Sequence, residues 1–371
     1  MQTALANGFP ETVELRRAIE PEIRAFGAQL DREEAQGRDT SCLRQVLREL
    51  RWRLEYTANA DGIRANLERL RTLAATSPSR REGGCTDVWF LELDEAVDHM
   101  LAADFDEHGE PPRFLDRVND PRRLKDYLES LLVSRPAEDG VDRRKELNFA
   151  TAGLSRLILW RRPPNYLWDP RLEAVIRDFV AQWQDPVTGF FGAIYLIDGR
   201  RVRTVDLSLT FHMARYLEGR IGYWPELIDT LLAIRDERYP YGWLDENGLS
   251  NHNNYDVAVL FQLGWPQMRP DQRRRAAQEL DRLTDWCLNT AIASDGTIRV
   301  RAASESLPES YYFAVAFLDT VGYFEPAGRF WTARAFPEAP AVRERLARQL
   351  LTLLQSHPMV RMARERLSGS R

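Results

Sequence analysis

The chain has 371 residues, of which 44% are hydrophobic and 29% charged, and its 51 basic and 56 acidic side chains give a formal net charge of −5. A chain of this length can bury a large core, and its composition excludes intrinsic disorder and collagen-like order. The acidic balance argues against nucleic acid as a partner, because phosphate binding draws most of its non-specific affinity from excess Lys and Arg. We therefore expect a globular protein that does not bind nucleic acid.

Membrane, metal and cofactor signals are also missing. No apolar run approaches the roughly 20 residues of a spanning helix, and the first residues lack the basic and apolar regions of a secretory signal. The sequence thus predicts a cytoplasmic protein without stable membrane insertion. Cys42, Cys85 and Cys287 are widely separated and lack the CxxC spacing of a zinc site. We expect no cofactor and no metal, and we interpret the acidic run 104–110 as a solvated loop.

Near the N-terminus, apolar residues recur every three or four positions over residues 40–56, which predicts a helix with one buried face. A charged helical segment follows at 63–73. We expect residues 1–80 to form an N-terminal helical extension or first hairpin, and residues 81–371 to form a single catalytic domain. Near the C-terminus, a helix is predicted at 341–355, whereas the basic stretch 361–371 is expected to be frayed.

Loop glycines recur about every 53 residues, at Gly84, Gly140, Gly189, Gly242 and Gly296, and this period fits one helical hairpin plus a loop. Apolar helical segments alternate with more charged ones; the apolar segments are 149–160, 207–217, 255–265 and 311–324, and the charged ones are 171–183, 225–235 and 271–291. A helix that is apolar nearly all round is buried on all sides. The alternation predicts an all-α fold, an α/α toroid of about six helical hairpins with inner and outer rings and short β-hairpin loops at the cavity mouth. An open α-solenoid or an unrelated bundle is the alternative.

One run resembles a known repeat. Residues 184–191, Gln-Asp-Pro-Val-Thr-Gly-Phe-Phe, resemble the glutamine, glycine and aromatic repeat of the terpenoid cyclase and protein prenyltransferase superfamily, with Phe191 where a Trp is common. Residues 241–243 and 295–297 resemble degenerate copies, so the resemblance covers roughly residues 140–300. It implies an α/α toroid with a central cavity and terpenoid-cyclase-like chemistry. The DxDD and DDxxD motifs of such cyclases are absent, and sugar-active enzymes also use α/α toroids.

Inner helices of a toroid run the same way, so the polar residues at their N-terminal ends converge at one mouth of the cavity. Catalytic candidates at these positions are Asp206, His212, His252, Tyr255, Asp256 and Glu305. Substrate-binding candidates are Asn148, Phe191, Arg203, Trp243, Asn251, Asn254, Arg301, Glu309, Tyr311 and Tyr312.

The strongest signal is the polar cluster at residues 251–256, Asn-His-Asn-Asn-Tyr-Asp, placed before an apolar helix. It holds more polar side chains than a helix cap requires. Asn and His donors beside a Tyr hydroxyl can polarise a carboxylate and abstract a proton, as sugar lyases do. Alternatively, Asp256 and His252 form an acid-base pair, or the cluster is a structural turn.

The remaining candidates each have a functional and a structural interpretation. Asp206 is either an N-cap or an acid whose pKa is raised by burial, and His212 is either a core histidine or a catalytic one. Glu305 and Glu309 either partner Asp206 or Asp256, as carboxylates do in inverting glycosidases, or are solvated.

Two basic loops carry further candidates. Arg203 belongs to an Asp-Gly hairpin over residues 197–203, and Arg301 belongs to the loop 298–301. They either bind a uronate or diphosphate group or are exposed arginines. The aromatic candidates either stabilise carbocations, stack on sugars or belong to the core.

Three functions remain open at this point. The first is a terpenoid-cyclase-like lyase or isomerase that uses acid-initiated chemistry, with Asp206 or Asp256 as the acid. The second is a carbohydrate-active enzyme, a glycoside hydrolase or polysaccharide lyase, and the third is a non-enzymatic helical scaffold. The expected partner is a small-molecule substrate, isoprenoid or saccharide. A closed apolar cavity would favour an isoprenoid, and an open groove lined by polar groups would favour a glycan.

Overall fold

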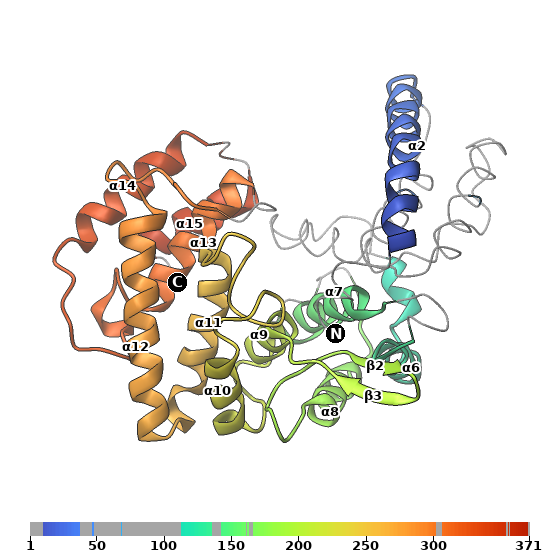
Figure 1. Ribbon diagram of the computed structural model, residues 1–371, viewed down its shortest axis with the longest axis horizontal. Helices are drawn as coiled ribbons and strands as arrows, with labels where there is room; N and C mark the ends of the chain where they lie inside the picture. Colours follow the sequence, from blue (N-terminus) through green and yellow to red (C-terminus); the bar gives the residue numbers. More distant parts are fainter. Residues whose placement is uncertain are drawn as a thin grey trace. The chain divides into compact units, whose positions relative to one another are not determined.

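A computed structural model describes residues 10–37, 47, 68, 113–135, 142–160, 162, 166–301, 306–353, 355 and 357–369 (Figure 1). The chain divides into two compact units. One holds residues up to Phe179 together with Ala193–Thr204, and the other holds Val180–Gly192 together with Val205 onward. The described residues are mostly helical, with one small sheet. This confirms the helix-rich class, whereas the closed toroid stays a prediction. The segments 40–56, 63–73 and 104–110 and the boundary at residue 80 lie outside the described residues, apart from the isolated positions Leu47 and Glu68.

The first unit contains helices and a three-stranded sheet. Its elements are α2 (Pro10–Ala35), the 3-10 helix η2 (Arg113–Arg117), α6 (Pro121–Leu131), β1 (Val133–Ser134), α7 (Arg144–Ser155), the π-helix η3 (Arg156–Trp160), α8 (Leu172–Trp183, which continues into the second unit), β2 (Ile194–Ile197) and β3 (Arg200–Arg203). β1 pairs in parallel with β2, and β2 pairs antiparallel with β3. Asp198 and Gly199 both have positive φ, 50° and 70°, as a two-residue hairpin turn requires. The predicted Asp-Gly hairpin is thus confirmed.

The second unit is helical. Its elements are α9 (Leu207–Tyr216), α10 (Trp224–Ala233), α11 (Asn251–Gly264), η4 (Trp265–Gln267), α12 (Pro270–Trp286), the π-helix η5 (Cys287–Ala291), α13 (Leu307–Thr320), η6 (Pro326–Gly328), α14 (Ala339–Leu351) and α15 (Pro358–Ser368). The expected apolar and charged segments from residue 149 onward all contain helices at these positions, and in this unit they form one buried hydrophobic cluster.

Helices α9 and α11 lie side by side and run in the same direction. The rings of Phe211 and Tyr255 are 5.6 Å apart near the start of both helices. Just beyond the end of α9, a Cβ built at Gly219 would lie 3.6 Å from the side chain of Leu263. The two pairs are equally far apart in the sequence, as parallel helices require.

Helices α11 and α13 are parallel as well. The His252 ring stacks on Phe313 with 4.2 Å between centroids near the starts of the helices, and Gln262 donates a hydrogen bond to the carbonyl of Thr320 near their ends. The three parallel helices bring their N-terminal ends to the same side of the second unit, as the inner-helix prediction requires.

Each of these helices begins at a capping side chain. Asp206, Ser250 and Ser306 accept hydrogen bonds from the backbone N–H three residues further on. Because Ser250 is the cap of α11, residues 251–256 form the first turns of the helix, and the expectation that this polar cluster precedes the helix was wrong. The helical repeat places Asn251, Asn254 and Tyr255 on one face and His252 beside Asp256.

Two of the repeat glycines, Gly189 and Gly296, lie where a side chain would overlap the backbone of a later helix. Gly189 has a φ of 70°, and a Cβ there would overlap the backbone of Leu227 at the start of α10. Gln184 holds the same loop, because its side-chain amide donates to the carbonyls of Gly189 and Gly222 at 2.8 and 2.7 Å. Gly296, with a φ of 91°, approaches the backbone of Arg345 on α14 in the same way. Two of the segments that carry the superfamily resemblance thus pack their loops against a later helix, α10 and α14.

The C-terminal stretch differs from expectation. Residues 361–371 were expected to be frayed, but most of them belong to α15, where Val360, Ala363 and Leu367 are buried. These residues recur at helical spacing and form one face, which belongs to the hydrophobic cluster of the second unit. Basic residues on the other face concealed this pattern in the sequence.

Candidate functional site

The polar residues of α11 are deeply buried. Asn251 and Asn254 are 2% and 1% exposed, and both the amide nitrogen and the amide oxygen of each have no hydrogen-bond partner among the residues that the structure describes. Asn253, on the same turn, donates to the carbonyl of Trp243 at 2.9 Å. Since the large majority of buried polar side-chain atoms are hydrogen-bonded, two adjacent unpartnered amides indicate a place for a bound molecule or ordered water.

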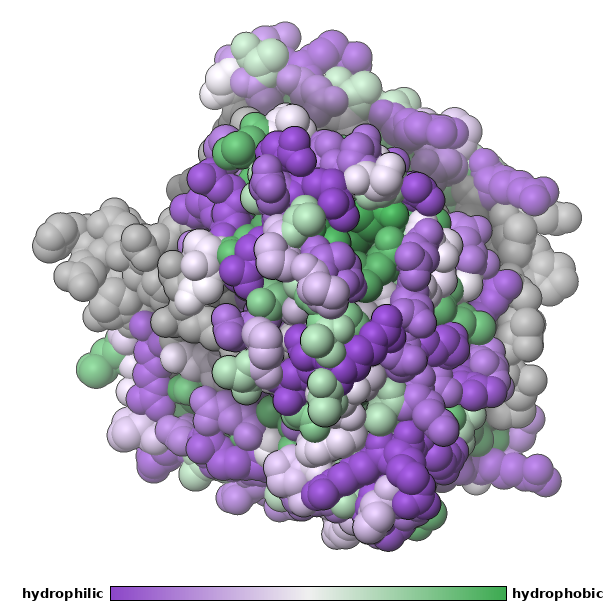
Figure 2. Space-filling model, turned by 90° about the vertical axis from the view of Figure 1, so that its left-hand side faces the viewer, coloured by the Kyte–Doolittle hydropathy of each residue, from purple (hydrophilic) through white to green (hydrophobic). Residues whose placement is uncertain are grey.

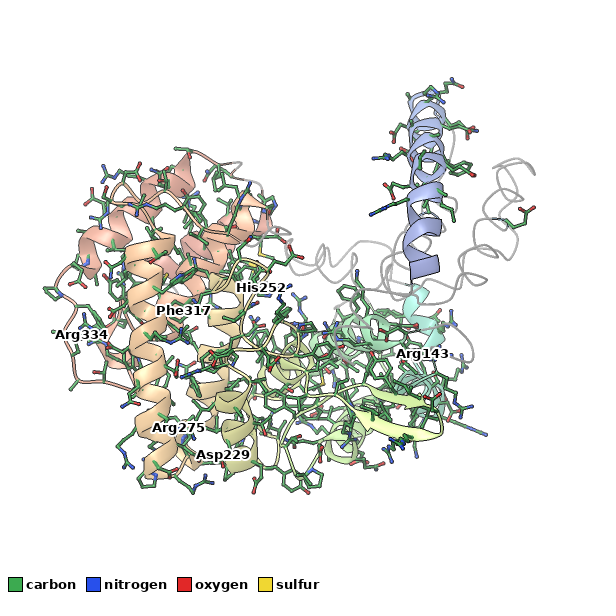
Figure 3. The ribbon with its side chains drawn as sticks, in the orientation of Figure 1. Arg143, Asp229, His252, Arg275, Phe317 and Arg334 are labelled. Carbon is green, nitrogen blue, oxygen red and sulfur yellow. The ribbon has the colours of Figure 1, made fainter. Side chains whose placement is uncertain are left out.

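His252 lies at the beginning of α11, where Figure 3 labels it. Its ring stacks on Phe313 and lies 5.6 Å from the ring of Tyr239, and about one third of its side chain, 33%, remains exposed. Burial of the rest lowers the pKa of His252 from 6.5 to about 4, against the opposing effect of Glu309 and Asp245. The imidazole is therefore neutral at pH 7 and able to accept a proton.

Asp256 lies one helical turn after His252 on α11 and is more deeply buried. Its Oδ2 lies 4.0 Å from the His252 Nε2, and only 1% of its side chain is exposed. This distance is too long for a hydrogen bond but suits an ion pair once the imidazole is protonated. The two side chains thus lie near each other, and their acid-base pairing stays a prediction.

A network of arginines and tyrosines adjoins the cluster. The Arg215 guanidinium lies 5.6 Å from the ring of Tyr255 and forms a hydrogen bond with Tyr312. Arg366 of α15 forms an ion pair with Asp319 at 2.8 Å, and its guanidinium lies 5.8 Å from the rings of both tyrosines. Two cations thus occupy positions over the aromatic rings in this part of the second unit.

The two phenols of this network have opposite pKa shifts. Burial raises the pKa of Tyr255 above its usual value. Burial also acts to raise that of Tyr312, but Arg215, Arg366 and the hydrogen bonds from Arg215 and Tyr255 together lower the pKa of Tyr312 below 10. Tyr312 is therefore the acceptor of the pair.

Other candidates have structural contacts. Asp206 accepts the backbone N–H of Leu209 at 3.0 Å, and Glu309 accepts that of Ser306 at 2.7 Å in a capping box. Phe191 and Trp243 are fully buried in the core, and Tyr311 is buried too. The His212 ring stacks on Tyr216 within α9, with 5.7 Å between centroids. A catalytic or binding role for these six residues stays a prediction.

The last candidates belong to other parts of the chain than α11. Asn148 on α7 and Arg203 on β3 belong to the first unit, and Arg301 is exposed. Glu305 lies outside the described residues. Sequence reasoning missed Arg215 and Arg366. A charged residue inside the apolar run 207–217 was a usable signal for Arg215, whereas the expected fraying of the C-terminus hid Arg366.

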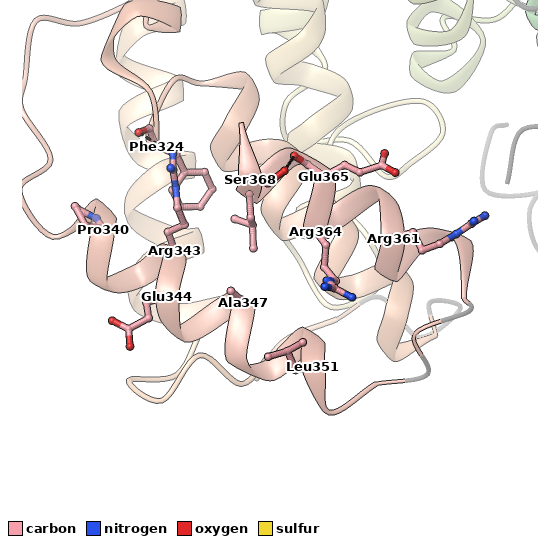
Figure 4. Close-up of a pocket in the computed structure, with 11 residues that line it drawn as sticks. Phe324, Pro340, Arg343, Glu344, Ala347, Leu351, Arg361, Arg364, Glu365 and Ser368 are labelled. Atoms are coloured by element: carbon pink, nitrogen blue, oxygen red, sulfur yellow. Dashed lines mark hydrogen bonds between the residues drawn. The ribbon is translucent and has the colours of Figure 1, made fainter. Parts of the chain in front are cut away.

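Two pockets open elsewhere on the second unit. One, of about 780 Å³, lies between α14 and α15 and includes Phe324, Ala347 and Leu351 in its lining (Figure 4). The other, of about 460 Å³, is lined by residues from α12, η5, α14 and the loops between these elements. The face carrying α12 and α14 is mainly hydrophilic with a hydrophobic hollow (Figure 2). No predicted site residue within the described ranges lines either pocket.

Comparisons with protein-family models, curated proteins and solved structures find no match to the chain. The resemblance to the terpenoid cyclase superfamily therefore stays a prediction. Within the described ranges, no helix is long and apolar enough to cross a bilayer, and no group of His, Cys, Asp and Glu side chains could hold a metal ion.

Proposed function

We propose that the protein is a carbohydrate-active lyase that binds an acidic saccharide at the N-terminal end of α11 and removes a proton from it. This is the second of the three functions that the sequence left open. The observation that carries the proposal is the placement of the unpartnered amides of Asn251 and Asn254 beside the neutral, partly exposed imidazole of His252.

Each group has a role in this reaction. The amides of Asn251 and Asn254 bind the uronate carboxylate and favour negative charge on it as the proton leaves. His252 accepts the proton from the carbon next to the carboxylate, the electrons of that C–H bond form a C=C bond, and the bond to the glycosidic oxygen breaks. The imidazolium then returns the proton to the departing oxygen, so that protons balance over the cycle. Asp256, 4.0 Å away, stabilises the imidazolium while it exists.

The substrate itself tunes the base. A bound carboxylate near His252 favours the protonated imidazole and raises the pKa of His252 from its low value towards neutrality. A base with a pKa near the working pH transfers protons most effectively. The site is thus expected to become active only when an acidic ligand is bound.

Hydrolysis by paired carboxylates receives less support. Asp206 and Glu309 each accept a backbone N–H at a helix start, so their carboxylates are held as caps. The Asp256 carboxylate, 4.0 Å from His252, is almost fully buried. A neutral imidazole beside amide groups suits elimination better than hydrolysis.

Carbocation chemistry is also less favoured. A terpenoid cyclase uses ring faces to stabilise positive charge on its substrate. Here the rings of Tyr255 and Tyr312 already face the guanidiniums of Arg215 and Arg366. A carbocation near these rings would be repelled by two like charges.

Binding and substrate class can be tested together in a thermal-shift screen. The full chain is heated with oligogalacturonate, a neutral cello-oligosaccharide or geranylgeranyl diphosphate, because a ligand of the native state raises the melting temperature. We expect stabilisation by oligogalacturonate alone, and its loss in Asn251→Leu, Asn254→Leu and His252→Gln. The matched control is Asn247→Leu, an exposed turn residue outside the cluster. Stabilisation by the diphosphate, or by no compound, would favour the cyclase or the scaffold instead.

A further inference from the structure

The 460 Å³ pocket of the second unit lies apart from the cluster on α11 and carries basic side chains from three segments. Arg299 comes from the loop after η5, Arg334 from the segment before α14, and Arg345 from α14 itself. Two acidic side chains, Asp285 and Glu338, also line it. The pocket lies within the range of about 300 to 1,000 Å³ that is usual for small-molecule sites.

Both acidic groups of the pocket have partners within the protein. The Asp285 carboxylate lies 3.7 Å from the Arg334 guanidinium, which also binds Asp281 at 2.9 Å. The Glu338 carboxylate accepts a hydrogen bond from the Tyr323 hydroxyl at 3.3 Å. The Tyr323 hydroxyl is neutral, so Glu338 keeps its negative charge, and the lining carries three arginines against two carboxylates.

Of the two cations Arg299 and Arg345, the second gives the stronger indication of a bound ligand. Its Nε is buried and has no hydrogen-bond partner among the described residues, and it forms no ion pair with them. Arg299 likewise forms no ion pair within the described part of the chain, although it lowers the pKa of Asp295. A buried guanidinium N–H without an acceptor is unfavourable, so an acceptor from a ligand would stabilise it.

The backbone fixes these two arginines relative to each other. Arg299 donates its backbone N–H to the carbonyl of Ala291 at 2.7 Å, which holds its loop against η5. Gly296, in the same loop, approaches the backbone of Arg345 so closely that any Cβ would require a shift. The π-helix η5, which contributes Leu288 and Asn289 to the lining, is a type of element that occurs frequently at functional sites.

We propose that this pocket binds a small phosphate monoester. The arginines of the lining outnumber its carboxylates, so an anion is favoured there, and guanidinium groups bind phosphate through paired N–H donors. Leu288, Ile292 and Val342 form an apolar wall for the organic part of the ligand, and Asn289 offers hydrogen bonds to its hydroxyl groups. This site is independent of the proposed lyase chemistry.

Isothermal titration calorimetry on the full chain tests the proposal, with inorganic phosphate and a hexose phosphate as probes and acetate and the free hexose as controls. We expect both phosphates to bind and both controls to fail. Arg345→Met and Arg299→Met should each weaken phosphate binding about tenfold or more, since each removes a charged hydrogen-bond donor. Arg348→Met, an exposed position of α14 outside the pocket lining, should leave binding unchanged, as should His252→Gln.

The outcomes that overturn the proposal are distinct. No phosphate binding to the folded wild-type chain removes the site, and binding that survives both Arg299→Met and Arg345→Met places the phosphate elsewhere. Acetate that binds as tightly as phosphate overturns the assigned ligand class. Because Arg299 is exposed on a loop, its variant is expected to fold even where Arg345→Met does not.

Discussion

His252 and Asp256 lie one helical turn apart on α11, with the imidazole Nε2 of the first 4.0 Å from the carboxylate of the second. The carboxylate is buried, while one third of the imidazole reaches solvent. In the proposed reaction, His252 takes the proton from the substrate and Asp256 stabilises the resulting positive charge. The arrangement follows from the start of the helix at Ser250, because only a helical backbone brings residues 252 and 256 together.

The low pKa of His252 predicts a pH dependence of stability. The unfolded chain protonates this residue near pH 6.5, but the folded chain does so only near pH 4, so between these values the unfolded state binds the additional proton. The free energy of unfolding should therefore fall as the pH drops from 6.5 to 4, and His252→Gln should reduce this fall. Urea unfolding of both proteins across this range provides the measurement. An imidazole resonance of His252 that titrates at 6.5 or above by NMR would contradict the prediction.

Replacing an unpartnered asparagine by leucine should raise the stability of the fold and, in the proposed site, weaken ligand binding. Leu has nearly the shape of Asn, and Asn254→Leu removes two buried polar groups that lack partners, so its free energy of unfolding should rise by about 1 kcal/mol. Asn253→Leu should instead lower it by about 1 to 3 kcal/mol, because the carbonyl of Trp243 loses its donor. Chemical denaturation compares the two variants directly. If Asn254→Leu is destabilised as strongly as Asn253→Leu, ordered water satisfies the amide and the site is structural.

The ion pair between Arg366 and Asp319 predicts a coupled effect on stability. Asp319 is 8% exposed, and Arg366→Met leaves its carboxylate without this cation, which should cost about 3 kcal/mol. Arg366→Met combined with Asp319→Leu should recover part of the loss. Arg348→Met, whose partner Glu344 lies 4.0 Å away at the surface, should change stability by less than about 0.5 kcal/mol. A double-mutant cycle that shows no coupling would contradict this account.

Alanine substitutions at two glycines with the same backbone angle distinguish the cost of backbone strain from the cost of steric overlap. Gly189 and Gly199 both have a φ of 70°, but a Cβ at Gly189 would overlap the backbone of Leu227, whereas one at Gly199 would meet nothing within 4 Å. Gly199→Ala should therefore cost only the left-handed backbone penalty of about 1 to 2 kcal/mol. Gly189→Ala should cost clearly more, as judged by thermal or urea unfolding. Equal losses would mean that close approach is not what selects glycine at position 189.

Helical periodicity predicted most helices of the second unit. Segments such as 207–217 and 271–291 match α9 and α12 with η5 closely, because alternating buried and exposed faces leave a clear pattern. The start of α11 was misplaced because a run of polar residues resembles a loop, although Ser250 offers a cap one position earlier. α15 was missed because its three arginines alternate with the three apolar residues that are buried, so the stretch resembles a basic tail.

The candidate site was predicted only in part. Residues 251–256 were chosen because they exceed what a cap needs, and the structure brings His252 and Asp256 together. The contributions of Arg215 and Arg366 could not be foreseen in full, since they depend on which helices pack around Tyr255 and Tyr312. Asp206 was chosen correctly as a residue at a helix start, but the sequence could not decide its role, because a position before an apolar helix suits capping and catalysis equally.

The most direct test of the proposed lyase is the identity of the ends that it creates. Oligogalacturonate is incubated with the wild-type chain, and new reducing ends and the ultraviolet absorbance of unsaturated uronate are counted in the same sample. Elimination yields one unsaturated end for every new reducing end, and His252→Gln should abolish both. Reducing ends without unsaturated ones, or activity that survives in His252→Gln, would contradict proton abstraction by His252.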